Sequence, residues 1–342
     1  MNSSLTWLRA VAVAGSAVVA SGLLTMAAPV SVAAPAANAG TSQFKGVNWA
    51  DPRDNYASDE VVPSGLSKSD SYGVTYAKAT AVAGQFRAKV GANTVRLPIN
   101  PATVNGFYWK SYIGAIDAAK ANGFTVILAY WESPEAKDGR IDDTTAFTAM
   151  WNRVVARYAG AGTVYFEPMN EPFGYSSQEW RDVAVNWLAA YPNVPRSRVF
   201  VGGTGYSEDV KPVCADPRLA GTHLALHQYG FWHKDWTDPQ QWADDLRARI
   251  GTCASRTVLD EFGSSMTTGL NYNGPVNGSN EIAYLQAATS TLRRLGMGSV
   301  YWPGLRNDDT YSLTRIECGG IDIKLAVNNR SGLDLLHRAW GR

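Results

Sequence analysis

Two glutamates in the chain stand where a pair of carboxyl groups could act together. Glu171 lies in the segment Phe-Glu-Pro-Met-Asn-Glu-Pro-Phe-Gly (166–174), directly after an apolar, β-rich run. Proline cannot donate to a sheet ladder and glutamate is uncommon in strands, so the acids in this segment need another reason to be there. Glu261 ends a second run, Val-Leu-Asp-Glu-Phe (258–262), 90 positions later. Two carboxyl groups that face each other across a cleft can hydrolyse a glycosidic bond, because one protonates the leaving oxygen while the other attacks the sugar or activates water.

The elements that must position this pair recur along the chain. Eight short β-rich runs alternate with stretches whose apolar residues are spaced three and four apart, as in helices. The runs cover residues 44–50, 93–99, 124–131, 163–169, 198–203, 222–229, 257–262 and 298–303. Strand followed by helix, eight times in about 300 residues, predicts an α/β fold with a single (β/α)8 TIM barrel. An open doubly wound sheet is the alternative, but no glycine-rich phosphate loop follows the first run.

The barrel order predicts that the two glutamates meet. Active sites of such barrels lie at the carboxyl ends of the strands, and one strand-helix unit takes about 31 residues. A separation of 90 positions is therefore close to three units, which places Glu171 after strand four and Glu261 at the end of strand seven. Those strand ends lie across the barrel mouth, so the side chains can share a ligand. The spacing alone does not choose between retaining and inverting chemistry.

The start of the chain predicts secretion. An apolar run follows the single charge at Arg9, and Ala37 and Ala39 fit a small-x-small cleavage site. We therefore expect a signal peptide over residues 1–39, a catalytic barrel over residues 40–342, and no membrane attachment after cleavage. A membrane anchor is the alternative, but the run is shorter and richer in alanine and glycine than a spanning helix of about 20 apolar residues.

Charge and cysteine content bear on the binding partner, the disulfide and the possibility of a zinc site. The whole chain has 31 basic and 30 acidic side chains, and loss of Arg9 would leave it formally neutral. No basic stripe suggests nucleic acid, so a neutral partner is expected. Three cysteines in a secreted protein predict one disulfide, which we place between Cys214 and Cys253 near the barrel bottom, leaving Cys318 free. The chain has only four histidines and no Cys-x-x-Cys motif, which argues against a structural zinc site.

Several of these motifs together resemble a known family. "FEPMNEP" resembles the Asn-Glu-Pro acid/base signature of the retaining glycoside hydrolases of clan A, most closely glycoside hydrolase family 5, the cellulase-like family. "VLDEFG" resembles the nucleophile strand of that family. Four further residues fall at matching strand ends in the same order along the chain: Arg96, His227, Tyr229 and Trp302.

The resemblance implies a role for each matching residue at the scissile bond. Glu171 would be the acid/base and Glu261 the nucleophile. Arg96 and Tyr229 would hold the nucleophile ionised through charge-assisted hydrogen bonds. The family needs no metal and no cofactor, so none is expected here.

The remaining matching residues would bind the sugar. Asn170 would hydrogen-bond the 2-hydroxyl, His227 would line the floor, and Trp302 would lie under the sugar at the cleavage point. Many family members carry a histidine soon after strand three, whereas this chain has Tyr130 and Trp131 there, which we include as substrate-binding candidates. Three tryptophans are further candidates for flat sugar platforms: Trp131, Trp232 and Trp236.

The leading hypothesis is a secreted, monomeric retaining β-glycoside hydrolase that cleaves a β-linked polysaccharide or oligosaccharide. A carbohydrate-binding barrel that has lost catalysis is one alternative, and the intact acid pair argues against it. A transglycosylase with the same residues, in which a sugar hydroxyl replaces water, is another. The sequence leaves the sugar, the linkage and the choice between endo and exo cleavage open.

Overall fold

Eight parallel strands form a ring in the order β4-β3-β2-β1-β8-β7-β6-β5, and a parallel bridge from Phe166 to Val199 joins the two ends of that order. The computed structural model describes residues 40–53, 57–132 and 137–342, so the predicted signal peptide lies outside the described residues. The strands are β1 (Lys45–Trp49), β2 (Thr94–Ile99), β3 (Thr125–Tyr130), β4 (Val164–Glu167), β5 (Phe200–Gly202), β6 (His223–Tyr229), β7 (Thr257–Gly263) and β8 (Gly298–Leu305). Each lies within or overlaps a predicted run, and the predicted (β/α)8 barrel is confirmed.

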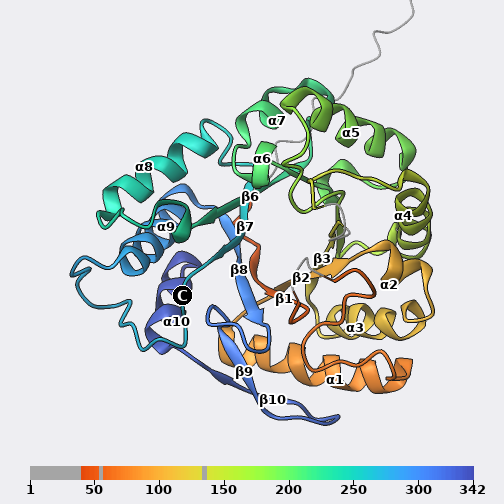
Figure 1. Ribbon diagram of the computed structural model, residues 1–342, viewed down its shortest axis with the longest axis horizontal. Helices are drawn as coiled ribbons and strands as arrows, with labels where there is room; N and C mark the ends of the chain where they lie inside the picture. Colours follow the sequence, from red (N-terminus) through yellow and green to blue (C-terminus); the bar gives the residue numbers. More distant parts are fainter. Residues whose placement is uncertain (1–39, 54–56, 133–136) are drawn as a thin grey trace, which may run out of the picture. The chain divides into compact units, whose positions relative to one another are not determined.

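Helices connect successive strands and surround them (Figure 1). They are α1 (Tyr72–Gln85), α2 (Pro101–Asn105), α3 (Trp109–Ala121), α4 (Thr144–Tyr158), α5 (Ser177–Ala190), α6 (Thr204–Ser207), α7 (Lys211–Ala215), α8 (Pro239–Ile250), α9 (Asn280–Leu295) and α10 (Arg330–Ala339). The connection after β5 is the short one, since α6 and α7 are single turns, in agreement with the loop-like sequence there.

Helix ends follow local capping signals. Ser176 begins α5 with a capping box, in which its hydroxyl accepts from the Glu179 amide and the Glu179 carboxylate accepts from the Ser176 amide. Ser279 and Asp143 cap α9 and α4 in the same position. At the other end of α9, Gly296 takes the left-handed conformation that terminates a helix. These local signals determine where α4, α5 and α9 begin and where α9 ends.

Alternation along the strands separates the outer core from the barrel interior. In β3, Leu128 packs in the large core between the strands and helices, whereas Ile127 packs in a cluster inside the ring. That inner cluster closes one layer of the barrel with six buried apolar residues: Phe44, Ile127, Phe200, Ala225, Val258 and Val300. The next layer toward the carboxyl ends of the strands carries charged side chains instead, described below.

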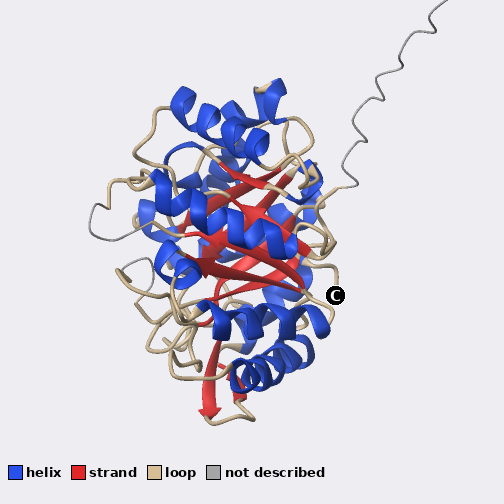
Figure 2. Ribbon diagram, turned by 90° about the vertical axis from the view of Figure 1, so that its right-hand side faces the viewer, coloured by secondary structure: helices blue, strands red, loops and turns tan. Residues whose placement is uncertain are grey.

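A β-hairpin between β8 and α10 was not predicted. Its strands are β9 (Thr314–Cys318) and β10 (Lys324–Val327), which pair antiparallel (Figure 2). The hairpin is anchored on α1, because the Gln85 side-chain oxygen accepts from the Leu325 amide at 2.7 Å. Leu325 is fully buried while most of β9 is exposed, so the apolar signal in the sequence is too short to mark strands.

The predicted disulfide is confirmed. Cys214 and Cys253 are bonded, with their Cα atoms 6.3 Å apart, and Cys318 is an exposed free thiol. The bond joins α7 to the segment that precedes β7, at the amino-terminal end of the barrel strands. Arg256 reinforces the same region by donating to the carbonyls of Leu219 and Thr222 at 2.8 Å. Among the described residues, no helix is long and apolar enough to cross a membrane.

Candidate active site

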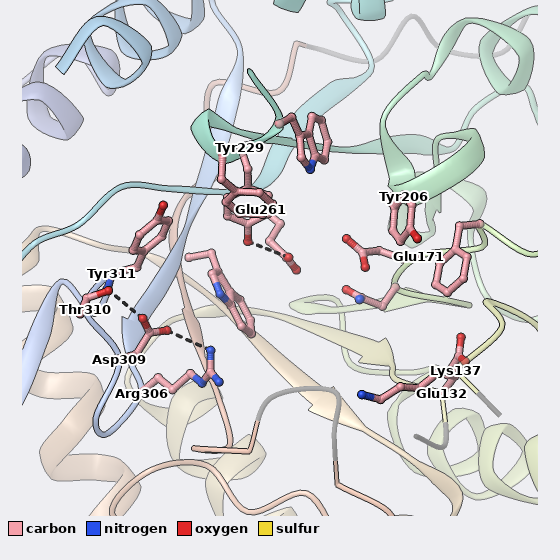
Figure 3. A pocket seen from close by; sticks show the side chains of 15 residues that line it. Glu132, Lys137, Glu171, Tyr206, Tyr229, Glu261, Arg306, Asp309, Thr310 and Tyr311 are labelled. Carbon is pink, nitrogen blue, oxygen red and sulfur yellow. Dashed lines mark hydrogen bonds and ion pairs between the residues drawn. The ribbon is translucent and has the colours of Figure 1, made fainter. Parts of the chain in front are cut away.

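Glu171 and Glu261 point toward each other across one cavity (Figure 3). Glu171 follows β4 and Glu261 lies in β7, as predicted from their spacing. One carboxylate oxygen of Glu171 lies within 4.8 Å of one carboxylate oxygen of Glu261, and a ring nitrogen of His227 lies within the same distance of both. The two acids are therefore close enough to act on a single bond.

The proline-rich segment after β4 is held by contacts other than a sheet ladder. The Asn170 amide donates to the Tyr130 carbonyl at the end of β3 at 2.9 Å. The Asn170 carbonyl accepts from the Ser207 hydroxyl at 2.7 Å, which ties the segment to α6. These two bonds fix the backbone at Asn170, directly before Glu171. The segment is therefore held without a sheet ladder, to which its prolines could not donate.

Glu261 is held by two donors. Arg96 Nη1 donates to Glu261 Oε2 at 3.0 Å, and the Tyr229 hydroxyl donates to Oε1 at 2.8 Å. Each oxygen thus accepts a hydrogen bond, and the one to Oε2 comes from a permanent cation. Donors of this kind stabilise the ionised carboxylate and fix its orientation.

Arg96 joins the site residues into one buried network. Its guanidinium is bidentate to Glu167, with N···O distances of 2.6 and 2.7 Å, and donates to Asn170 Oδ1 at 2.6 Å and to Asn48 Oδ1 at 3.1 Å. Burial opposes the charge, but the facing carboxylates, Glu167 foremost, raise the pKa of Arg96 above its ordinary value. Because Oδ1 of Asn170 accepts from Arg96, the Nδ2 amino group is the end of this amide that can donate to a ligand.

Glu171 is held by a histidine. His227 Nδ1 lies 2.9 Å from Glu171 Oε1 and 3.8 Å from Glu261 Oε1. His227 is fully buried on β6, and burial lowers its pKa, so the ring is neutral at neutral pH. The two glutamates therefore have different neighbours, a cation and a phenol for Glu261 and a neutral imidazole for Glu171.

The cavity has a volume of about 630 Å³. Its wall includes Trp302, which packs against Trp131 with the ring centroids 5.5 Å apart. Gly263, two residues after Glu261, lets the two strands approach: an added Cβ would lie 2.1 Å from the Trp302 carbonyl oxygen. The end of the Glu261 strand and the backbone of the tryptophan are thus in direct contact.

The predicted site residues fall into three groups. Five line the cavity: Asn170, Glu171, Tyr229, Glu261 and Trp302. Arg96 and His227 lie beneath them and contact the glutamates, and Trp131 lies behind Trp302. Tyr130 departs from the expectation, because it packs in the outer core with its ring 5.0 Å from Phe147 of α4. Alternation along β3 explains this, since Tyr130 shares the face of Leu128 rather than that of Ile127.

The structure places the two remaining candidate sugar platforms, Trp232 and Trp236, in different surroundings. Trp232 lines the cavity, and Arg249 lies over its ring at 4.9 Å. Trp236 does not line it, because it stacks on His233 at 3.8 Å and packs against Trp242 in the outer core.

Sequence reasoning missed much of the cavity wall. Phe173 and Tyr206 stack at 4.4 Å, and Phe231 stacks on Tyr229 at 4.8 Å. Tyr206 and Phe231 are each about half exposed. Phe173 stands in the quoted segment itself, three residues after Asn170, which was a usable signal. Tyr206 reaches the cavity from α6, whose sequence carries no recognisable motif.

Charged residues form two facing walls (Figure 3). After β8, Arg306 pairs with Asp309 at 3.0 Å, and the Asp309 carboxylate also accepts from the Tyr311 amide at 2.8 Å. Glu132 and Lys137 line the cavity near the end of β3. Burial raises the pKa of Glu132 to about 7.

Two groups of side chains could in principle hold a metal ion, because their carboxylate oxygens and histidine nitrogens lie within 4.8 Å of one another. One group is Glu171, His227 and Glu261, and the other is Glu167, His227 and Asp260. Arg96 already supplies a positive charge to Glu167 and Glu261, so these groups give no reason to assign a metal ion to the site.

Comparisons with known proteins agree with this geometry. The family model "Cellulase (glycosyl hydrolase family 5)" matches residues 55–305. No curated protein was found to match the chain. Among solved structures, the chain is similar to the catalytic domain of the major endoglucanase from Xanthomonas campestris pv. campestris, with 18% identity, a TM-score of 0.60, and coverage of 88% of this chain and 95% of that one.

Two further similar structures contain oligosaccharides. XacCel5A in complex with cellopentaose is 19% identical, with a TM-score of 0.59 and coverage of 87% of this chain and 99% of that chain. An endocellulase–cellotetraose complex from Pyrococcus horikoshii is 15% identical, with a TM-score of 0.61 and coverage of 86% and 92%. At these identities the structures support the fold, whereas the family model spans most of the chain and its cavity glutamates. The chain belongs to glycosyl hydrolase family 5 and is a glycoside hydrolase acting on O-glycosyl bonds.

Proposed function

We propose that this chain is a secreted retaining β-glycoside hydrolase that cleaves a β-linked glucan through a covalent intermediate on Glu261. The observation that carries the proposal is the approach of Glu171 and Glu261, whose nearest ligand-type oxygens lie within 4.8 Å. Retaining enzymes place their two carboxyl groups about 5–5.5 Å apart, whereas inverting enzymes leave room for a water at about 6.5–9.5 Å. Secretion rests on the sequence of residues 1–39.

The different neighbours of the two glutamates support a division of labour. Arg96 and Tyr229 favour the ionised form of Glu261, which suits a nucleophile. Glu171 instead faces the neutral imidazole of His227, which adds no positive charge to hold this carboxyl group ionised. In the first step Glu171 protonates the leaving oxygen while Glu261 attacks the sugar carbon, and in the second Glu171 takes a proton from the water that releases the sugar.

Other cavity residues would orient the sugar. Asn170 can donate from Nδ2 to a sugar hydroxyl while its oxygen stays on Arg96. Trp302 offers an apolar face on the cavity wall. A chain of β-linked glucose is the proposed substrate, supported by the cellopentaose and cellotetraose bound in the two similar structures.

The decisive experiment compares Glu171→Gln and Glu261→Gln on two substrates, an unactivated β-linked oligosaccharide and a β-glycoside with an activated aryl leaving group. Loss of the nucleophile should abolish turnover of both. Loss of the acid should cost roughly 10²–10⁴-fold on the unactivated substrate. The loss should be much smaller on the activated one, whose leaving group departs without a proton. Glu317→Gln on exposed β9 is the matched control.

Azide tests the same assignment independently. In Glu171→Gln, azide should restore turnover of the activated substrate and give a β-glycosyl azide, because the anion needs no base. The roles are reversed if Glu171→Gln is equally damaged on both substrates, or if azide rescues Glu261→Gln with a β-azide product. Sizing the products from a β-glucan, with and without added acceptor sugars, separates hydrolysis from transglycosylation.

A further inference from the structure

A β-bulge in β7 turns a second acid into the barrel interior. The pairing of β6 with β7 shifts by one residue just before His227, which pairs with Glu261, so Asp260 is the extra residue. A bulge re-aims the side chains beside it, and two successive residues can then face the same side. Both do so here: Asp260 Oδ2 lies 3.7 Å from Arg96 Nε, and Glu261 Oε2 lies 3.0 Å from Arg96 Nη1.

Asp260 lies behind the histidine that holds Glu171. Its Oδ1 is 3.7 Å from His227 Nε2, while Nδ1 of the same ring is 2.9 Å from Glu171 Oε1. Asp260 and His227 are fully buried. Within the described part of the chain, neither carboxyl oxygen of Asp260 has a hydrogen-bond partner, and neither has Nε2 of His227. Three side chains thus form a line from the cavity into the barrel.

We propose that Asp260 is a positioning residue that selects which ring nitrogen of His227 carries the proton, and thereby sets the hydrogen bond that His227 makes to Glu171. The inference rests on the proposed acid/base role of Glu171. A neutral imidazole has one donor and one acceptor. If Asp260 donates to Nε2, then Nδ1 keeps its proton and donates to Glu171. If Asp260 accepts from Nε2, then Nδ1 must accept from a protonated Glu171.

The surrounding charges favour donation by Asp260. The charged and titratable groups that face it are Glu167 from β4, Glu261 from β7, Arg96 from β2 and His227 from β6. Arg96 makes its short hydrogen bonds to Glu167 and Glu261 and stays 3.7 Å from Asp260. Burial first, and then the charge of Glu167, raise the pKa of Asp260 well above its usual range, against the opposing effect of Arg96.

A protonated Asp260 is thus the donor that the barrel interior offers to Nε2, and the 3.7 Å between Oδ1 and Nε2 must shorten for that hydrogen bond to form. With Nε2 accepting, His227 donates from Nδ1 to Glu171. Donation to a carboxylate stabilises its ionised form. The ionised form of Glu171 is the one left after the leaving group has been protonated, and it is the one that must accept the proton of the attacking water. Asp260 thus supports the second half of the reaction from a place that no substrate atom can reach.

Two variants of Asp260 test the inference through the pH profile of kcat/KM. Asp260→Asn keeps a donor of the same shape and should leave the profile close to that of the parent enzyme. Asp260→Leu removes the donor, so Nδ1 can accept from protonated Glu171, and the alkaline limb should move up by about one pH unit. Asp216→Asn, at a remote buried carboxylate, controls for loss of a buried acid and should not move either limb. Equal shifts in both Asp260 variants, or no shift in Asp260→Leu, would overturn the inference.

The tautomer of His227 can be read without activity. Long-range ¹H–¹⁵N correlation spectra of the parent protein should show a protonated Nδ1 and an unprotonated Nε2, with the signals assigned by their loss in His227→Asn. Asp260→Asn should show the same tautomer. A protonated Nε2 in the parent protein contradicts the inference, even if Asp260→Leu fails to fold. This readout does not depend on Glu171 being the acid/base, whose failure the leaving-group comparison would report separately.

Discussion

Two buried histidines, four positions apart on β6, lie in layers of the barrel interior that have opposite characters. His223 lies in the layer near the amino-terminal ends of the strands, with its ring 5.0 Å from those of Phe44 and Phe200. Burial lowers its pKa to about 4. His227 lies one layer further, within 3.8 Å of carboxylate oxygens of Glu171 and Glu261. The same residue type on the same face thus packs against aromatic rings in one layer and contacts the two cavity carboxyl groups in the next.

The two layers differ in what their burial costs in free energy. The apolar layer buries rings against rings, which stabilises the fold without strict geometry. The charged layer buries a guanidinium with several carboxyl groups, and such a cluster is stabilising only while every partner stays in place. We therefore expect substitutions in the charged layer to damage stability and activity together, and substitutions in the apolar layer to damage stability alone.

The largest effect is expected for Arg96→Met. The substitution leaves Glu167 and Glu261 buried without their cation, so the free energy of unfolding should fall by about 3–5 kcal/mol. Activity should vanish because Glu261 and Asn170 each lose the hydrogen bond that Arg96 donates. Denaturant unfolding and kcat/KM measure the two losses. The contrasting variant is Phe44→Leu in the apolar layer, for which about 1–2 kcal/mol and unchanged kcat/KM are expected. Retention of parental stability by Arg96→Met would refute the distinction between the layers.

The disulfide should stabilise the amino-terminal end of the barrel without touching the chemistry. Replacing Cys214 and Cys253 together with serine removes a cross-link over a sequence separation of 39, so the free energy of unfolding should fall by about 2–4 kcal/mol. Below the lowered melting temperature kcat/KM should equal that of the parent. Cys318→Ser, which removes the free thiol, should change neither quantity. A loss of kcat/KM in the folded double variant would show that the two ends of the barrel are coupled.

Tyr229→Phe should sharpen the role of the charged layer at a smaller cost. The variant loses one hydrogen bond to Glu261, and a bond to a charged group contributes about 1.5–3 kcal/mol. We expect kcat/KM to fall roughly ten- to hundredfold. If Glu261 is the proposed nucleophile, the acidic limb of the pH profile should move to higher pH, because the ionised form of Glu261 is less stabilised. Tyr191→Phe removes a hydroxyl that contacts Asn152 outside the cavity and should not alter the profile.

The smallest expected effect is a pH dependence of stability that comes from His223 in the apolar layer. The folded-state pKa of His223 is lowered to about 4. As the pH falls, the unfolded chain therefore binds a proton at this histidine before the folded protein does. The stabilisation is complete above about pH 6.5 and is lost as the pH falls toward 4. Between pH 7 and pH 5 this term amounts to about 2 kcal/mol. His223→Phe should therefore lose less stability over that interval than the parent.

Glu132 should contribute a pH dependence of stability with the opposite sign. Its folded-state pKa is raised to about 7, so its stabilisation is complete below about pH 4.5 and is lost as the pH rises through 7. Glu132→Gln removes this gain on acidification, so the variant should lose more stability between pH 7 and pH 5 than the parent. Melting temperatures at pH 5 and 7 for the three proteins decide the matter, and identical slopes would contradict both assignments.

The barrel and its acid pair could be predicted because both follow from periodicity. Eight β-rich runs at regular spacing fix the order of the strands, and the order places Glu171 and Glu261 at one mouth. Tyr130 was open to the same logic, since alternation along β3 puts it on the helix side with Leu128. Its place at the carboxyl end of a strand suggested the cavity, whereas the face of the strand that it occupies places it in the outer core.

Other features lay beyond the sequence for physical reasons. The bulge at Asp260 is a choice of strand register, which local residues do not announce. Tyr206 meets Phe173 only after α6 has docked beside the segment that follows β4. The hairpin of β9 and β10 depends on Gln85 of α1, more than 200 positions away. Each arises from contacts between distant parts of the chain rather than from local propensity.

The close approach of Gly263 to the Trp302 carbonyl has a consequence for how this enzyme can be altered. With only 2.1 Å available to an added Cβ, the site tolerates no side chain unless one strand retreats. Contact between main-chain atoms therefore sets the spacing between the strand that carries Glu261 and the strand that carries Trp302. Directed evolution of new sugar preferences should find position 263 invariant among active clones, and variation should collect instead at Tyr206, Phe231 and Arg306, whose side chains line the cavity without serving as spacers.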